Sequence, residues 1–199
     1  MSPRYKSRVR ITGGFWLLIA WFWWANGWRL LATVLLAAAV HEAGHLLMLR
    51  LLGVGMESLR VSVFGAEIRP EGTYISYGGE LAALLAGPAA NLLCGMALAL
   101  SGSCWLVPAG AHLTLGCFNL LPIRPLDGGR ALYLLVSWLA GPAAGEWAAR
   151  CIGVSTAIGL GVFLAWLMWR SGGSLWLLPA LLGLLLALVG ELRGNRSFL

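Results

Sequence analysis

Long apolar stretches separated by short polar connections dominate the pattern of the chain. Several run for about 15–22 residues with almost no charge, and at about 1.5 Å per helical residue they approach or match the roughly 30 Å of a bilayer core. We therefore predict six membrane-spanning helices, the first of them short. They cover residues 15–25, 30–49, 81–100, 105–121, 152–169 and 175–189.

Two segments between these stretches have a different pattern. In residues 54–79, β-branched and aromatic residues alternate with polar ones and Gly and Pro interrupt them, which predicts short strands. Residues 128–150 combine an apolar face with charges and a Gly-Pro break, which predicts an interfacial helix followed by a bend. The expected fold is thus an all-α polytopic membrane protein, a single domain over 1–199, with a small β-hairpin or sheet inserted between the second and third spans.

Composition strengthens the membrane assignment. Hydrophobic residues make up 59% of the 199 residues and charged residues only 11%, whereas a soluble domain has about 25% charged residues. The net charge of +6 resides mostly in the short connections, so it needs no nucleic-acid partner. The four cysteines have no metal-binding spacing and lie in or beside apolar segments, where we expect them to act as small hydrophobic residues.

The distribution of Lys and Arg predicts the topology. If the N-terminus is inside, residues 1–13 form a basic cytoplasmic tail, and of the 14 basic residues only Arg29 and Arg170 fall outside. This asymmetry fits the positive-inside rule with six spans and both termini in the cytoplasm. The start of the chain also resembles a signal peptide, but its apolar run is rich in Trp and lacks a cleavage site, which favours a retained first span.

The segment HEAGH, residues 41–45, carries the clearest chemistry. Positions i and i+4 of a helix share a face, so His41 and His45 can reach one metal ion with Glu42 beside it. The competing interpretation is a chance match to a short pattern. However, ionisable groups within a span cost at least about 2.5–3.5 kcal/mol each and persist mainly where they have a function. Three of them in five residues favour a zinc site with Glu42 as general base.

Two histidines leave a tetrahedral zinc site short of one protein ligand. Asp127 is the best candidate, because it follows Pro122 and Pro125 at a predicted break in the fourth span, on the same cytoplasmic side as the histidines. Irregular backbone at membrane depth is tolerated where it lines a cavity. The other candidates are expected to be interfacial, solvated or ion-paired; they are His112, Glu80, Glu146 and Glu191.

HEAGH in an apolar helix, with NLLPIRPLDGG about eighty residues later, resembles the site-2 protease family of intramembrane zinc metalloproteases, peptidase family M50. The family's second motif is written NxxPxPxLDG, and GPAAN at residues 87–91 is similar to its GxxxN element. The six-span layout resembles the sporulation-type branch, stage IV sporulation protein FB, although no CBS domain follows here. The residues that share types with the second motif are Asn119, Pro122, Pro125, Leu126, Asp127 and Gly128.

The resemblance implies a metalloendopeptidase in a bacterial cell membrane, and the distribution of Lys and Arg predicts that its active site faces the cytoplasm. One Zn²⁺ would be held by His41, His45 and Asp127, with Glu42 as catalytic base and acid. The resemblance also implies a membrane-associated protein substrate, which in the sporulation branch is a pro-sigma factor, and an inhibitory membrane partner. Residues expected to bind substrate are Asn91, Asn119, Pro122 and Pro125.

Two other functions stay open from the sequence alone. One is a catalytically silent relative that binds membrane partners, although the metal and base residues are all present. The other is a metal transporter, which would be expected to have repeated halves or several polar sites along a path. The chain has one such site and no visible repeat, so both are alternatives to the protease.

Overall fold

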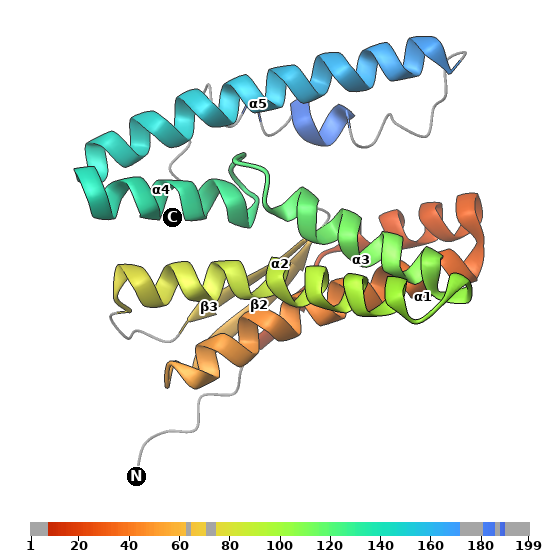
Figure 1. Cartoon of the computed structure of the whole chain (residues 1–199), viewed down its shortest axis with the longest axis horizontal. Coiled ribbons are helices and arrows are strands. Elements are labelled where there is room, and N and C mark those ends of the chain that lie inside the picture. The colour runs from red at the N-terminus through yellow and green to blue at the C-terminus, as the bar shows by residue number, and fades with distance from the viewer. Residues whose placement is uncertain (1–7, 63–64, 71–74, 172–180, 186–187, 190–199) are drawn as a thin grey trace. The chain divides into compact units, whose positions relative to one another are not determined.

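The computed structural model describes residues 8–62, 65–70, 75–171, 181–185 and 188–189, and most of them are helical (Figure 1). It divides into two compact units, Met1–Phe118 and Asn119–Leu199. In chain order, the elements are β1 (Arg8–Ile11), α1 (Gly13–Leu51), β2 (Met56–Ser62), β3 (Gly65–Pro70), α2 (Tyr77–Leu100), the short 3₁₀ helix η1 (Ser103–Trp105), α3 (Leu106–Asn119), α4 (Asp127–Ala140) and α5 (Pro142–Arg170).

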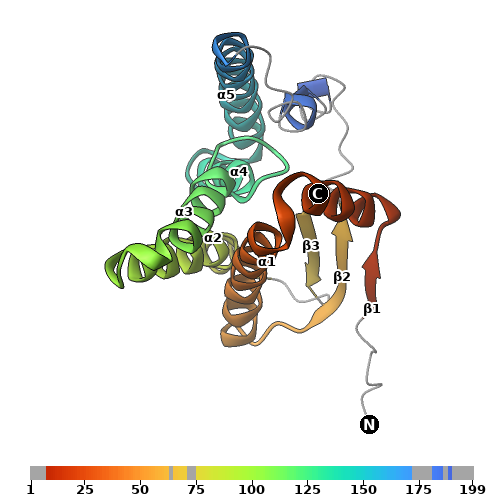
Figure 2. The ribbon, with the colours of Figure 1, turned by 90° about the vertical axis from the view of Figure 1, so that its right-hand side faces the viewer.

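Helix α1 contains the first two predicted spans. Its 39 residues would extend about 58 Å as a straight helix, nearly twice the thickness of a bilayer core. The helix is broken at Gly27, which has φ 79° and ψ 166°, a conformation that glycine adopts without steric cost. The red and orange parts of α1 accordingly run in different directions (Figures 1 and 2). The break lies in the predicted connection between residues 25 and 30.

The end of α1 is fixed nearly two turns after HEAGH. Gly53, at φ 73°, donates to the carbonyl of Arg50, and Val54 donates to that of Leu49, at 3.0 and 2.9 Å. These two bonds make a Schellman motif, which satisfies carbonyls that the helix leaves free. Leu49 and Val54 also pack together with Ala83 of α2 in a buried cluster. The histidine-bearing end of α1 is thereby attached to α2.

One strand before α1 and two strands after it form a single three-stranded sheet in the order β1-β2-β3 (Figure 2). β2 and β3 pair antiparallel, from Ser62 opposite Gly65 to Met56 opposite Pro70, within the 54–79 segment where we expected strands. β1 pairs parallel to β2 and was not expected, because residues 1–13 were interpreted as a tail. The sequence RVRI alternates basic and apolar residues with the period of a strand, which was the available signal.

Helices α2 and α3 complete the first unit. α2 starts at Ser76, whose hydroxyl accepts a bond from the Gly79 amide at 3.2 Å, as an N-cap residue does. α3 has 14 residues, or about 21 Å, so by length alone it is shorter than the predicted fourth span. Within the described residues, three helices are long and apolar enough to cross a membrane: α1, α2 and α5. The chain is therefore a membrane protein, and six spans stay a prediction.

The second unit contains α4 and α5, which lie side by side in both views (Figures 1 and 2). They meet at Gly141, and the Gly-Pro bend was expected there. However, α5 begins at Pro142, ten residues before the predicted start at 152, so the 128–150 segment is divided between two helices. Small buried residues let α5 approach its neighbours; these are Gly145, Ala149, Gly153 and Ala157. Of the predicted sixth span, 175–189, the structure describes only residues 181–185 and 188–189, which are helical.

Candidate metal centre

His41 and His45 form a close pair on one face of α1. Their side chains are 5% and 9% exposed, and their Nε2 atoms are 3.1 Å apart. The two rings are nearly perpendicular, with an interplanar angle of 82°. The helical spacing of four residues brings both ring nitrogens to one point, as the sequence predicted.

The hydrogen bond of His45 to Ala83 decides which of its two ring nitrogens carries the proton. Its Nδ1 donates to the carbonyl of Ala83 at 2.7 Å, so in the neutral ring Nε2 keeps a lone pair. Two nitrogens bound to one tetrahedral zinc at about 2.05 Å would be about 3.3 Å apart. The observed 3.1 Å between the Nε2 atoms of His45 and His41 is close to that value. The pair therefore fits a zinc ion.

Helix α2 approaches α1 closely at two glycines beside this pair. A Cβ at Gly44 would lie 2.5 Å from the carbonyl oxygen of Ala86, and a Cβ at Gly87 would overlap the imidazole of His45. Ala83, Gly87 and Asn91 are spaced by four residues, so they share the face of α2 that meets the histidines. The close contact of Gly87 with the His45 ring explains physically why GPAAN has glycine at its first position.

Replacing Gly87 by alanine is expected to displace His45 and lower the zinc content of the purified chain. The added methyl group would occupy the position of the imidazole, and a ligand that moves by about 1 Å no longer satisfies tetrahedral zinc. Zinc per chain would be measured by elemental analysis. Gly110→Ala is the matched control, since a Cβ there meets nothing within 4 Å. Equal zinc in both variants would contradict this account of Gly87.

Asn91 contacts the other ring nitrogen of His41, and His112 contacts Asn91. Asn91 is 0% exposed, its Nδ2 lies 3.3 Å from Nδ1 of His41, and its Oδ1 lies 3.1 Å from Nδ1 of His112. His112 is only 2% exposed, so the expectation of an interfacial residue was wrong. The sequence signal was an ionisable residue inside the apolar 105–121 stretch, which is costly without a partner.

Asp127 is the first residue of α4, where the helix dipole favours a carboxylate. The preceding loop contains a cis peptide bond between Arg124 and Pro125 and is tied down by a bond from Leu126 N to the Ile123 carbonyl at 2.8 Å. A Cβ on Gly128 would overlap the loop backbone. The Asp-Gly pair of NLLPIRPLDGG therefore allows the loop to fold tightly against the start of α4.

The other predicted site residues lie in or near this loop and on α1. Glu42, which lies between the two histidines in the sequence, is half-buried. Asn119 at the end of α3 and Pro122 are also half-buried, and Pro125 is exposed. Pro125 stands one position later than the second proline of NxxPxPxLDG, so the match to that motif is looser there than expected. The substrate-binding roles of the loop residues stay predictions.

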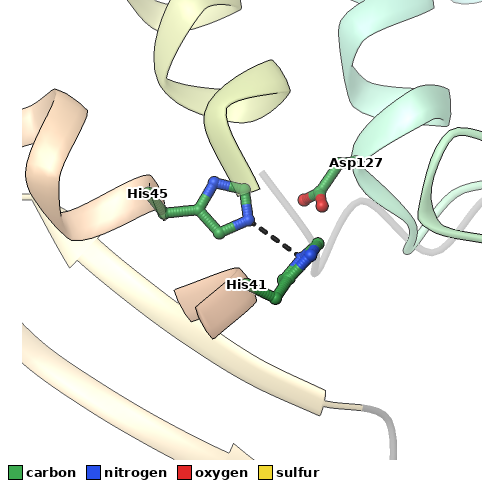
Figure 3. Close-up of side chains that lie close together, drawn as sticks. All are labelled: His41, His45 and Asp127. Carbon is green, nitrogen blue, oxygen red and sulfur yellow. Dashed lines mark hydrogen bonds between the residues drawn. The ribbon is translucent and has the colours of Figure 1, made fainter. Parts of the chain in front are cut away.

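His41, His45 and Asp127 make a group that could hold a metal ion (Figure 3). Each offers one ligand atom, and these atoms lie within 4.8 Å of one another. Two imidazoles and one carboxylate are a ligand set of catalytic zinc sites, which keep a fourth position for water or substrate. The sequence predicted these three residues as zinc ligands, and that role stays a prediction.

Comparison with known proteins gives relatives that are all named zinc metalloproteases. The chain is 35% identical over 133 residues to zinc metalloprotease Rip3 of Mycobacterium tuberculosis, covering 59% of this chain and 33% of the relative. It is 29% identical over 142 residues to a zinc metalloprotease of Methanocaldococcus jannaschii, covering 66% of this chain and 41% of the relative. The matches thus span only about a third to two fifths of these relatives. No family model matches the chain.

A solved structure has the same fold. The chain superposes on the site-2 protease from Methanocaldococcus jannaschii with a TM-score of 0.65, at 23% identity, over 94% of this chain and 90% of that one. At this identity the similarity describes the fold alone. The chain is therefore a membrane protein with a site-2 protease fold, similar in sequence to proteins named zinc metalloproteases.

Proposed function

We propose that the chain is an intramembrane zinc metalloprotease that hydrolyses a peptide bond in or near a membrane-spanning segment of another protein. The observation that carries the proposal is the histidine pair, with Nε2 atoms 3.1 Å apart and one ring fixed by the Ala83 carbonyl. The names of the relatives and the fold of the site-2 protease support the same activity.

In this proposal one zinc ion binds His41, His45 and Asp127. Zinc bound there would act as a Lewis acid on the peptide carbonyl and activate a water molecule at neutral pH. Glu42 accepts the proton of the attacking water and passes it to the leaving amine. Glu42 precedes His45 by three residues, a helical spacing that places the two side chains at neighbouring positions on the helix surface.

The topology remains part of the proposal. We infer a bacterial, multi-pass membrane protein with both termini and the active site toward the cytoplasm, from the distribution of basic residues. The substrate class is a membrane-associated protein, because the proposed site is carried by the apolar helix α1. A pro-sigma factor as substrate and an inhibitory membrane partner follow from the resemblance to the sporulation branch and remain proposals.

The experiment uses the purified chain in phospholipid vesicles with a tagged single-span protein that has helix-breaking residues near its cytoplasmic end. We expect a shortened fragment that a zinc chelator abolishes and that added Zn²⁺ restores, since the chemistry requires the metal. Cleavage that persists in the chelator would contradict the proposal. Movement of Zn²⁺ into the vesicles without any fragment would favour the transporter, and zinc binding with neither would favour the silent relative.

A further inference from the structure

His112 is a buried polar group for which the proposed chemistry gives no role. It lies on α3, and Asn91 connects it to the metal-ligand candidate His41 through contacts of 3.1 and 3.3 Å. His41 in turn meets His45 at 3.1 Å. All 3 histidines of the chain therefore belong to one hydrogen-bonded group, which extends from α1 through α2 to α3.

The packing of α2 against α3 holds this group in place. Gly95 lies one turn after Asn91, and a Cβ there would meet the side chain of Leu113 at 2.7 Å. Gly116 lies one turn after His112, and a Cβ there would lie 3.2 Å from the Pro88 carbonyl oxygen. Close approach at both glycines leaves little room for the Asn91 and His112 side chains to move.

The direction of the hydrogen bonds matters for metal binding. With the amide as oriented in the structure, Asn91 Nδ2 donates to His41 Nδ1, so the neutral His41 carries its proton on Nε2 and donates it to His45. A metal ion needs the lone pair of Nε2, so the proton must then be on Nδ1 and must be donated to an oxygen. The Asn91 amide supplies that oxygen when its two ends exchange places.

The exchanged arrangement also satisfies His112. Asn91 Nδ2 then donates to His112 Nδ1, and the His112 proton on Nε2 faces the sulfur of Cys94, 3.8 Å away. Without a metal ion, the original arrangement gives every ring nitrogen a partner, and with zinc on the two Nε2 atoms the exchanged arrangement would do the same. This matters because buried polar groups without partners are costly. An acceptor at His112 Nδ1 is therefore what allows Asn91 to present its oxygen to His41.

We propose that Asn91 and His112 are positioning residues for His41, holding the ring with its proton on Nδ1 and its Nε2 toward the metal. The inference rests on the proposed zinc site and adds that α3, through His112, sets the zinc affinity of that site. A hydrogen-bonded partner of a metal-binding histidine typically contributes about 10–100-fold to metal affinity. Asn91 is then a support for a ligand, which is a different role from the substrate binding expected from the sequence.

The test measures zinc affinity by chelator competition on the full chain in detergent. His112→Leu should weaken zinc binding by about 10–100-fold, because Asn91 loses the partner that fixes its amide. His112→Asn keeps a polar group near the former Nδ1 and should recover most of the affinity. Cys94→Ala serves as the control at the far end of the series and should change affinity by less than about 3-fold, since thiols bond weakly.

Nitrogen NMR of isotope-labelled histidine gives a second readout, which a role confined to helix packing would not move. In the zinc-bound chain, His41 should have its proton on Nδ1, and this signature should be lost in His112→Leu.

Wild-type affinity in a folded His112→Leu variant would overturn the inference. If that variant does not fold, the comparison of His112→Asn with His112→Gln decides, because only Asn places its amide near the former Nδ1. Equal zinc affinity of those two variants would also overturn it. A wild-type chain that binds no zinc would instead overturn the proposed function, so the two failures are distinguishable.

Discussion

Glu42→Gln is expected to abolish detectable cleavage while leaving zinc bound. Glutamine has nearly the same shape as glutamate but cannot accept a proton at neutral pH, and general acid–base catalysis contributes about 10²–10⁴-fold to a rate. His41 and His45 are unchanged in this variant, so the zinc content should equal that of the wild type. Fragment formation in vesicles and zinc per chain are the two measurements.

Glu80→Gln is a suitable control for this substitution. Glu80 is also half-buried and lies in the first turn of α2, outside the proposed site, so its variant should cleave at the wild-type rate. A Glu42→Gln chain that cleaves as fast as the control would exclude Glu42 as the base. A chain that loses its zinc instead would show that Glu42 supports metal binding.

Asp127→Ala is expected to reduce zinc affinity more than the loss of any hydrogen-bonded support does. It removes one of three protein ligands, and the remaining histidine pair is not sufficient for a tetrahedral site that keeps one open position. The decrease should exceed the about 10–100-fold that loss of a supporting partner costs. Asp127→Asn, which keeps a neutral oxygen ligand, should fall between alanine and the wild type.

Glu146→Ala is the matched control for Asp127→Ala, because it removes another carboxylate from the same compact unit. Glu146 pairs with Arg124 at 2.9 Å, and its side chain is 53% exposed, so the loss of this exposed ion pair should change little. If Asp127→Ala bound zinc as tightly as Glu146→Ala, Asp127 would not be a ligand. The group drawn in Figure 3 would then have to acquire its third ligand elsewhere.

The parts of the site that depend on local geometry could be predicted from the sequence. The spacing of His41 and His45 places them together on any helix, and the Pro-rich loop before Asp127 had to interrupt the helix that precedes it. The paired strands β2 and β3 lie where apolar and polar residues alternate. In each case residues close in sequence determined the result.

Other features depend on contacts that no local pattern contains. His112 was interpreted as interfacial because its partner, Asn91, lies 21 residues away on another helix, and only the close packing of α2 and α3 brings them together. The strand β1 forms by pairing with β2, which lies far away in the sequence. Its four residues were therefore interpreted as part of a tail. Helix α5 starts earlier than predicted because Pro142 suits the first turn of a helix. From the sequence, Gly141 and Pro142 were interpreted only as a bend.

The most direct test of the central claim is the zinc content of the purified wild-type chain beside that of the His41→Ala and His45→Ala variants, measured by elemental analysis in the same detergent. About one zinc per chain is expected in the wild type, as for a site with three protein ligands, and a large loss in both variants. A wild-type chain without zinc, or variants that keep it, would contradict the account.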